Sequence, residues 1–386
     1  MALPLDLPAG DPLAPELDAF VAAHGLADRS AALDRAPAFP AAEYRALGDD
    51  RWLGLTVRPD RGGRGLTLET AGRVLHRLAY RAGTAFAKLA LQPEFCSVLL
   101  DHGGAPLEAE WVRPLVAGRR LVGNHLTEPG SGSDARALRT TARRDGDEYV
   151  LRGTKSEAAF AVEADAAIVY ARVGEAPDGI TAFLVPQQLP GIERRAAAVD
   201  LGERWQRRGS IEYRDVRLPS AYRLGEEGAG FAYVRPELTR ERALLAAIYL
   251  GVARASWEET VGHVGGRLAF GRPLADQEAV SFPLVEDGAR LDAAALYVER
   301  TLRRLDRGEE AEGEAALAKW LATETALTTL DHAVQFHGGR GYSSELPHER
   351  RWRDVRSGAI AHGPAEVMHV VAARRLWPRR PPGDPT

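Results

Sequence analysis

Residues 127–134 concentrate groups that bind ligands through backbone and hydroxyl contacts, because they read Thr-Glu-Pro-Gly-Ser-Gly-Ser-Asp. Gly130 and Gly132 let a ligand approach the backbone closely and tolerate positive φ angles. Hydroxyls such as those of Thr127 and Ser133 can then bond to phosphate, sugar or carbonyl oxygens. The competing interpretation is an ordinary solvent-exposed turn, since glycine, serine and aspartate dominate turns. Composition alone favours the turn.

The segment closely resembles the flavin loop of the acyl-CoA dehydrogenase family. That resemblance covers roughly residues 30–376, and it implies that the chain binds FAD. Leu126, Thr127 and Gly132 would border the flavin ring, with Thr127 hydrogen-bonded to it. Ser133 would face oxygens of the substrate or the cofactor.

Residues 267–274 are similar to a second part of the family pattern, Arg-x-x-Phe-Gly-x-Pro. The resemblance implies that Arg267 meets the FAD phosphates and that Phe270 packs near the cofactor. A guanidinium suits this role because it offers phosphate a fixed fork of donors, although an isolated arginine is usually a solvated surface charge. Glu278 stands where the family usually has a glutamine beside FAD.

Residues 335–342 read Gln-Phe-His-Gly-Gly-Arg-Gly-Tyr and resemble a third family segment. There the glycines end a helix and let the backbone approach the adenine end of FAD. Gln335, Gly338 and Gly339 would make this contact. Because the family supplies it from a neighbouring subunit, the resemblance implies a homo-oligomer, either a dimer or a tetramer.

Two residues compete for the role of the catalytic base. His362 occupies the position of the glutamate in the family's Tyr-Glu-Gly-Thr sequence, and Glu241 matches the helix position used by the isovaleryl and long-chain branches. A desolvated carboxylate or an imidazole can remove a proton near neutral pH. The competing interpretations are a pocket wall for His362 and a solvated helix carboxylate for Glu241. Arg242 would resemble the arginine that helps to hold the acyl carrier arm.

One segment departs from the family pattern Gly-x-Lys-x-(Trp/Phe)-Ile-Thr-Asn. Gly153 and Lys155 are in register, but Glu157 replaces the aromatic residue, Ala159 the threonine and Phe160 the asparagine. In the family these residues lie against the flavin ring. Their loss is expected to weaken flavin contacts by about 1–3 kcal/mol, or to alter the substrate or the reaction.

Bulk composition excludes several other classes of protein. The chain has 386 residues and nearly balances 50 basic against 54 acidic side chains, which argues against a nucleic-acid partner. Its single cysteine, Cys96, excludes an intramolecular disulfide and a multi-cysteine metal site, and its apolar neighbours predict a buried thiol. We expect no metal. The N-terminus lacks signal-peptide features and no apolar stretch reaches membrane-span length, so we expect a cytoplasmic protein without membrane contact.

Periodicity predicts which elements carry these residues. Apolar spacing indicates helices over residues 14–120, short β-like runs follow from 121, and helical patterning returns over 238–264, 276–308, 311–337 and 364–376. We therefore expect an α+β fold of the acyl-CoA dehydrogenase type. Its predicted parts are an N-terminal α-helical domain (1–120), a middle β-barrel-like domain (121–232), a C-terminal four-helix bundle (233–376) and a disordered tail (377–386).

The leading hypothesis is an FAD-dependent acyl-thioester dehydrogenase of fatty acid or polyketide metabolism, with coenzyme A or an acyl-carrier protein as carrier. The family removes the α-proton while flavin N5 takes the β-hydride, and electrons pass to electron-transfer flavoprotein or another acceptor. The alternatives are a flavin-dependent monooxygenase of the same fold and a catalytically impaired partner subunit. The expected assembly is a homotetramer or a dimer.

Overall fold

The computed structural model describes residues 4–174 and 179–377, which fall into two compact units. The bundle unit consists of Met1–Val21, Leu68–Thr84 and Thr239–Thr386, and the sheet unit consists of Ala22–Thr67 and Ala85–Leu238. Residues 378–386 of the predicted tail lie outside the described part of the chain. Across the described ranges, no helix combines the length and the apolarity needed to cross a bilayer.

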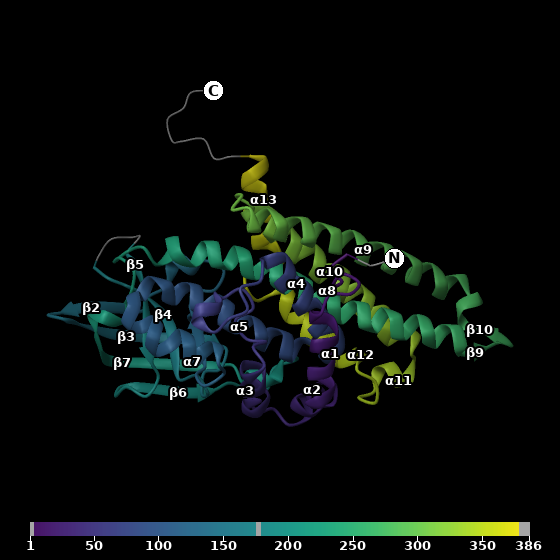
Figure 1. Ribbon diagram of the computed structural model, residues 1–386, viewed down its shortest axis with the longest axis horizontal. Helices are drawn as coiled ribbons and strands as arrows, with labels where there is room; N and C mark the ends of the chain where they lie inside the picture. Colours follow the sequence, from purple (N-terminus) through teal and green to yellow (C-terminus); the bar gives the residue numbers. More distant parts are fainter. Residues whose placement is uncertain (1–3, 175–178, 378–386) are drawn as a thin grey trace. The chain divides into compact units, whose positions relative to one another are not determined.

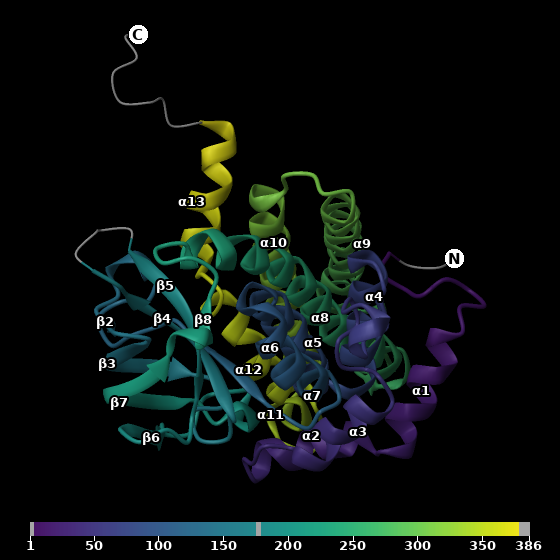
Figure 2. The same ribbon diagram turned by 60° about the vertical axis from the view of Figure 1, so that its left-hand side comes forward.

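Within its described residues, the sheet unit contains one sheet of eight strands (Figures 1 and 2). Seven of them lie in the order β6-β7-β3-β2-β4-β5-β8, and β1 pairs in parallel with β4. The strands predicted from sequence appear as β3, β4, β5 and β7. The bounds are β1 Val122–His125, β2 Thr141–Asp145, β3 Glu148–Ala158, β4 Ala166–Arg172, β5 Ile180–Pro186, β6 Ile192–Ala196, β7 Gly209–Pro219 and β8 Arg223–Leu224.

Strand β4 is buried on both faces, so it separates two apolar cores. Val169 belongs to a cluster with Tyr149 of β3 and Tyr213 of β7, which shows that the sheet folds over a shared interior. Alternate residues such as Tyr170 face the second cluster, where Cys96 lies fully buried as predicted. This period-two alternation is the reason for the nearly continuous apolar sequence of β4.

Helices of the sheet unit supply the second core. The longest, α5, buries apolar residues against the sheet, and its neighbours are short. The bounds are α2 Leu26–Arg35, α3 Ala41–Asp49, α5 Thr84–Leu100, α6 Gly104–Leu107 and α7 Arg113–Val116.

Long helices dominate the bundle unit, and α9 and α10 run side by side (Figure 1). Three predicted helices agree closely with α9, α10 and α13, whereas α8 begins at Gly230 rather than at Leu238. The later start was wrong because Pro236 lies inside the helix and does not mark its boundary. The bounds are α1 Leu13–Ala23, α4 Leu68–Ala82, α8 Gly230–Gly266, β9 Leu268–Ala269, β10 Arg272–Pro273, α9 Glu278–Asp306, α10 Glu312–Phe336, α11 Gly339–Tyr342, α12 His348–Arg356 and α13 Ala365–Leu376.

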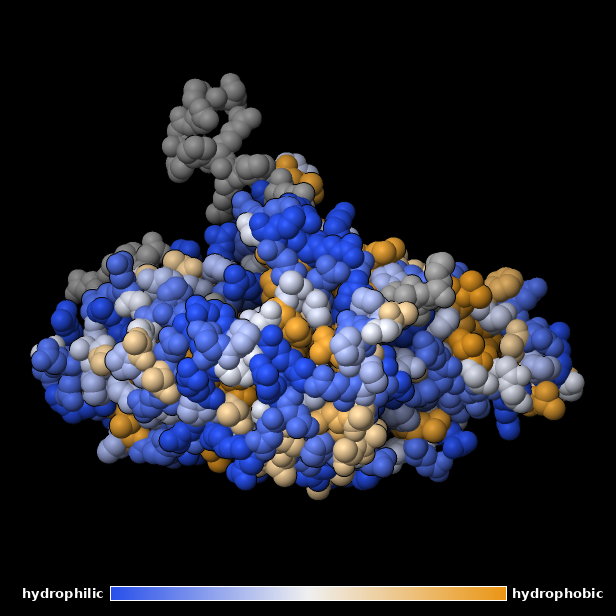
Figure 3. Space-filling view, in the orientation of Figure 1, coloured by the Kyte–Doolittle hydropathy of each residue, from blue (hydrophilic) through white to orange (hydrophobic). Residues whose placement is uncertain are grey.

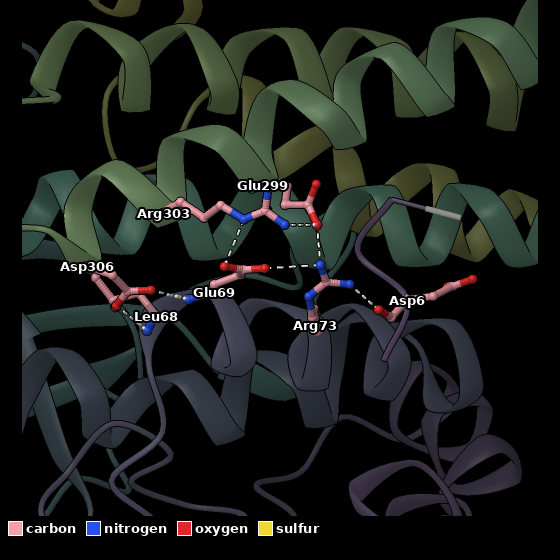
Figure 4. A network of polar contacts seen from close by, with 7 residues as sticks. All are labelled: Asp6, Leu68, Glu69, Arg73, Glu299, Arg303 and Asp306. Atoms are coloured by element: carbon pink, nitrogen blue, oxygen red, sulfur yellow. Dashed lines mark hydrogen bonds and ion pairs between the residues drawn. The ribbon is translucent and has the colours of Figure 1, made fainter. Parts of the chain in front are cut away.

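A network of hydrogen bonds and ion pairs connects α4 to α9 (Figure 4). The Asp306 carboxylate accepts hydrogen bonds from the backbone N–H groups of Leu68 (2.6 Å) and Glu69 (2.9 Å), so the end of α9 caps the start of α4. One turn further along α4, Arg73 pairs with Glu299 of α9 and with Glu69. These contacts fix the two helices in register inside the bundle unit.

Candidate active site

In the sheet unit, a buried side chain of the loop at residues 127–134 holds the loop in place. The buried carboxylate of Glu128 accepts hydrogen bonds from the N–H groups of Arg139 (2.5 Å) and Thr140 (3.0 Å) and from Lys155 Nζ (2.8 Å). Lys155 Nζ also donates to the Leu126 carbonyl at 3.1 Å. Glu128 is thus an internal support for the loop and not an exposed acid.

Burial and pairing act in opposite directions on the ionisation of these two groups. Burial alone would raise the pKa of Glu128, but hydrogen bonds led by that of Lys155 hold the pKa below its usual value. Burial lowers the pKa of the Lys155 ammonium to about 8, against the opposing effect of Glu128. The hydrogen bond between the two groups favours the charged form of each, so the pair constrains the loop.

The anchored loop leaves its ligand-binding groups accessible. Leu126 and Thr127 are half-buried, whereas Gly132 and Ser133 are exposed. A Cβ atom at Gly130 or Gly132 would meet nothing within 4 Å. The turn is therefore rigidly supported on one side and open on the other, which suits a ligand-binding loop better than an unconstrained solvent turn.

The residues that depart from the family pattern form an irregular end of β3. Glu157 and Phe160 both have left-handed backbone angles, and pairing with β7 is irregular between Lys155 and Ala158. Phe160 is buried beside Trp205, so its ring belongs to the core. The exposed Glu157 carboxylate pairs with Arg208 at 2.9 Å, which neutralises the charge that the sequence places there.

In the bundle unit, the two candidate bases lie in contact. Glu241 lies on α8, His362 follows α12, and His362 Nε2 is 3.3 Å from Glu241 Oε1. Glu241 is buried, and His362 is half-buried with a left-handed φ of 56°. The sequence treated these residues as alternatives, whereas the structure pairs them.

The other polar atom of each side chain is buried and has no hydrogen-bond partner among the residues that the structure describes. Glu241 Oε2 and His362 Nδ1 both have this property. Buried polar atoms are nearly always satisfied, and exceptions frequently mark functional sites. Within the described part of the chain, the pair therefore keeps one carboxylate oxygen and one ring nitrogen unpaired.

Arg242 adjoins this pair but is directed to the backbone. It is buried, and its Nε donates a hydrogen bond to the His362 carbonyl at 3.1 Å. Its predicted contact with the acyl carrier arm remains a prediction. Through this hydrogen bond, Arg242 holds the loop that carries His362.

The hairpin β9–β10 carries two of the predicted cofactor residues. Phe270 and Gly271 form its turn with φ angles of 52° and 79°, and the Phe270 side chain is 98% exposed. A fully exposed aromatic ring on a strained backbone indicates a residue kept for contact with another molecule. Within the described residues, the exposed Arg267 guanidinium forms no hydrogen bond or ion pair, so its donors are free for phosphate.

The third predicted cofactor segment lies beside this hairpin. His263, one turn before Arg267, stacks on His337 with ring centroids 4.2 Å apart. Gln335, Gly338 and Gly339 flank His337 and are exposed, as is Glu278 at the start of α9. Figure 3 shows hydrophobic surface gathered over the end of the bundle that carries β9 and β10. Two segments far apart in sequence thus meet at one end of the bundle unit.

These features fit FAD. A free guanidinium suits a phosphate, open glycines admit close backbone approach, and an exposed aromatic ring suits a planar group. The sequence identified these groups, but it missed the partnership of Glu128 with Lys155 and gave no role to Lys319. Lys155 was in register with the family pattern, whereas the only signal for Lys319 was the rarity of lysine, since the chain contains just Lys88, Lys155 and Lys319.

Comparison with known proteins gives matches over almost the whole chain. Family models describe an acyl-CoA dehydrogenase N-terminal domain (residues 13–119), middle domain (123–216) and C-terminal domain (228–377). Short-chain specific acyl-CoA dehydrogenase from Homo sapiens is 33% identical over 350 residues, covering 90% of this chain and 85% of the relative. Benzylmalonyl-CoA dehydrogenase from Aromatoleum aromaticum is 32% identical over 353 residues, covering 91% and 93%.

Solved structures give the same result. Butyryl-CoA dehydrogenase from Megasphaera elsdenii superposes with a TM-score of 0.87 at 27% identity, covering 96% of this chain and 99% of that one. This agreement supports the α+β architecture of helical, sheet and helical parts that the sequence predicted.

Proposed function

Because the chain belongs to the acyl-CoA dehydrogenase family, whose members are FAD-dependent oxidoreductases acting on CH–CH bonds, we propose that it oxidises the Cα–Cβ bond of an acyl-CoA thioester. Relatives named for short-chain, benzylmalonyl and butyryl thioesters support coenzyme A as the carrier. The observation that carries the proposal is the Glu241–His362 pair, with its two unpartnered buried atoms.

Glu241 acts as the base in this proposal. Its free atom Oε2 accepts the α-proton, while Oε1 keeps its contact with His362 Nε2. His362 Nε2 lies 3.3 Å from Oε1, and this contact would hold the orientation of the carboxylate through the transfer. His362 is therefore proposed as the partner that aims Glu241, which accounts for the presence of both residues.

FAD, when bound, supplies the acceptor for the hydride that leaves the β-carbon. We propose that Thr127 and Ser133 of the loop, together with Leu126 and Gly132, contact the flavin end. Arg267 and Phe270 would hold the phosphates and the adjacent part of the cofactor. Gln335, Gly338 and Gly339 would serve the adenine end across a contact between two copies of the chain, and their exposure supports this assignment.

An anaerobic titration tests the function. The purified yellow protein is mixed with a panel of straight-chain, branched and aryl acyl-CoA thioesters, and flavin absorbance is recorded. At least one thioester is expected to bleach the flavin. If none does, hydroxylation driven by reduced flavin would indicate a monooxygenase, and tight association with a related chain would indicate a partner subunit. Either outcome would replace the dehydrogenase proposal.

Replacement of Arg267 by methionine is expected to weaken FAD binding by about 10–100-fold. The lost interaction is a charged hydrogen bond to phosphate, of about 1.5–3 kcal/mol. The dissociation constant of FAD is measured by titrating apoprotein in both variants. Arg290→Met is the matched control, because Arg290 is an exposed arginine of the same unit that pairs with Glu286 at 2.8 Å. Equal FAD affinity of Arg267→Met and Arg290→Met would contradict the assignment of Arg267 to the cofactor site.

A further inference from the structure

Lys319 is a buried lysine whose ammonium contacts backbone carbonyls. It lies on α10, is almost completely inaccessible, and donates hydrogen bonds from Nζ to the carbonyls of Ala361 and Gly363, the latter at 2.6 Å. Burying an ammonium is costly, and retaining one requires that its donors be satisfied. Lys319 thus donates to the two carbonyls that flank the carbonyl of His362.

The carbonyl between these two is held from another helix. Arg242 of α8 donates from Nε to the His362 carbonyl at 3.1 Å. Lys319 and Arg242, two buried cations on different helices, therefore donate hydrogen bonds to three successive carbonyls. These are the carbonyls of Ala361, His362 and Gly363. We call this arrangement the carbonyl clamp.

The clamp lies at a strained piece of backbone. His362 has a φ of 56° and Gly363 a φ of 96°, and a left-handed conformation is unfavourable for a residue that carries a Cβ. At Gly363 the positive φ itself favours glycine, because a residue with a Cβ seldom adopts it. Strain of this kind persists only where the surroundings impose it, and the clamp provides that restraint.

The conformation determines where the imidazole lies. With the backbone held in this form, His362 Nε2 reaches Glu241 Oε1 at 3.3 Å. Release of the carbonyls would let residue 362 relax toward negative φ, which redirects its side chain. We propose that Lys319 is a positioning residue of the active site, acting through the His362 backbone to keep the imidazole on Glu241.

This inference rests on the proposed function only for its kinetic consequence, so the test has two independent readouts. The first uses FAD-loaded protein labelled with ¹³C-histidine, in which the His362 resonance is identified by its loss in His362→Ala. Lys319→Met, which preserves length and removes the donors, is expected to shift that resonance. Lys88→Met is the control, because Lys88 is a buried lysine of the sheet unit paired with Glu203 at 2.5 Å. An unmoved His362 resonance in Lys319→Met would overturn the proposal.

The second readout is the rate of flavin reduction by a saturating acyl-CoA. Lys319→Met is expected to lower it about tenfold in the wild-type background and less than about twofold in the His362→Ala background, since contacting residues are not additive. An equal loss in both backgrounds would indicate a merely structural lysine and overturn the proposal. If Lys319→Met yields no folded protein, Lys319→Gln replaces it, because its shorter side chain removes the ammonium while it keeps a polar group in the site. The same shift of the His362 resonance is then expected, and an unmoved resonance would again overturn the proposal.

The two readouts separate this inference from the proposed function. A shifted His362 resonance in a protein that no thioester reduces would support the clamp and refute the dehydrogenase activity. An unmoved resonance in a protein that bleaches normally would do the reverse.

Discussion

Replacement of Glu241 by glutamine is expected to slow flavin reduction by an acyl-CoA about 10²–10⁴-fold, the range associated with removal of a general base. The amide keeps the shape of the carboxylate but cannot take up the α-proton at its free oxygen position. Stopped-flow absorbance under anaerobic conditions measures the rate at saturating substrate. The FAD content and the thermal midpoint are recorded beside it, so that a loss of fold is distinguished from a loss of chemistry.

Glu237 provides the matched control for this experiment. It lies one turn earlier on α8 and is also a buried carboxylate. Glu237→Gln is expected to keep a rate within a few-fold of wild type. If the large loss occurs in Glu237→Gln and not in Glu241→Gln, the base has been assigned to the wrong turn of the helix.

Lys155→Met is expected to produce the largest loss of stability, about 3–5 kcal/mol. Removing one member of a buried ion pair leaves the other charge uncompensated, and here Glu128 would retain only its two backbone donors. The flavin loop would lose its anchor at the same time, so weaker FAD retention is expected. Chemical denaturation of wild type and variant measures the free energy of unfolding.

Strand β3 also supplies the comparison for this variant. Arg152 pairs with Asp215 at 2.7 Å, but both side chains are well exposed. Arg152→Met should therefore cost less than about 1 kcal/mol. Adding Glu128→Gln to Lys155→Met should recover part of the lost stability, because it removes the carboxylate charge that Lys155→Met leaves uncompensated. A double variant no more stable than Lys155→Met would show that charge is not the cause.

Most of the fold was predictable because its signals are local. The apolar spacing of α9 and α10 and the alternating or continuous apolar runs of β4, β5 and β7 are legible in the sequence. The start of α8 was not, since Pro236 is usually a boundary and here lies within the helix. The division into two units also escaped prediction, because each unit gathers segments that are distant along the chain.

The sequence named candidate residues for the site, but it did not indicate how they contact one another. Glu241 and His362 were each identified by position in a family pattern, and their contact depends on a left-handed backbone at residue 362 that histidine seldom adopts. Glu128 was part of a recognisable loop, yet a carboxylate in a glycine-rich turn is usually solvated. Its true partner, Lys155, became apparent only once β3 placed that ammonium beneath the loop.

The burial of Lys88, Lys155 and Lys319 has a practical and a chemical consequence. These are the only lysines of the chain, and none presents its ammonium to solvent. Amine-directed labels and crosslinkers should leave the side chains of the folded protein unmodified. A protein that handles activated thioesters would, by the same arrangement, offer them no lysine nucleophile on its surface.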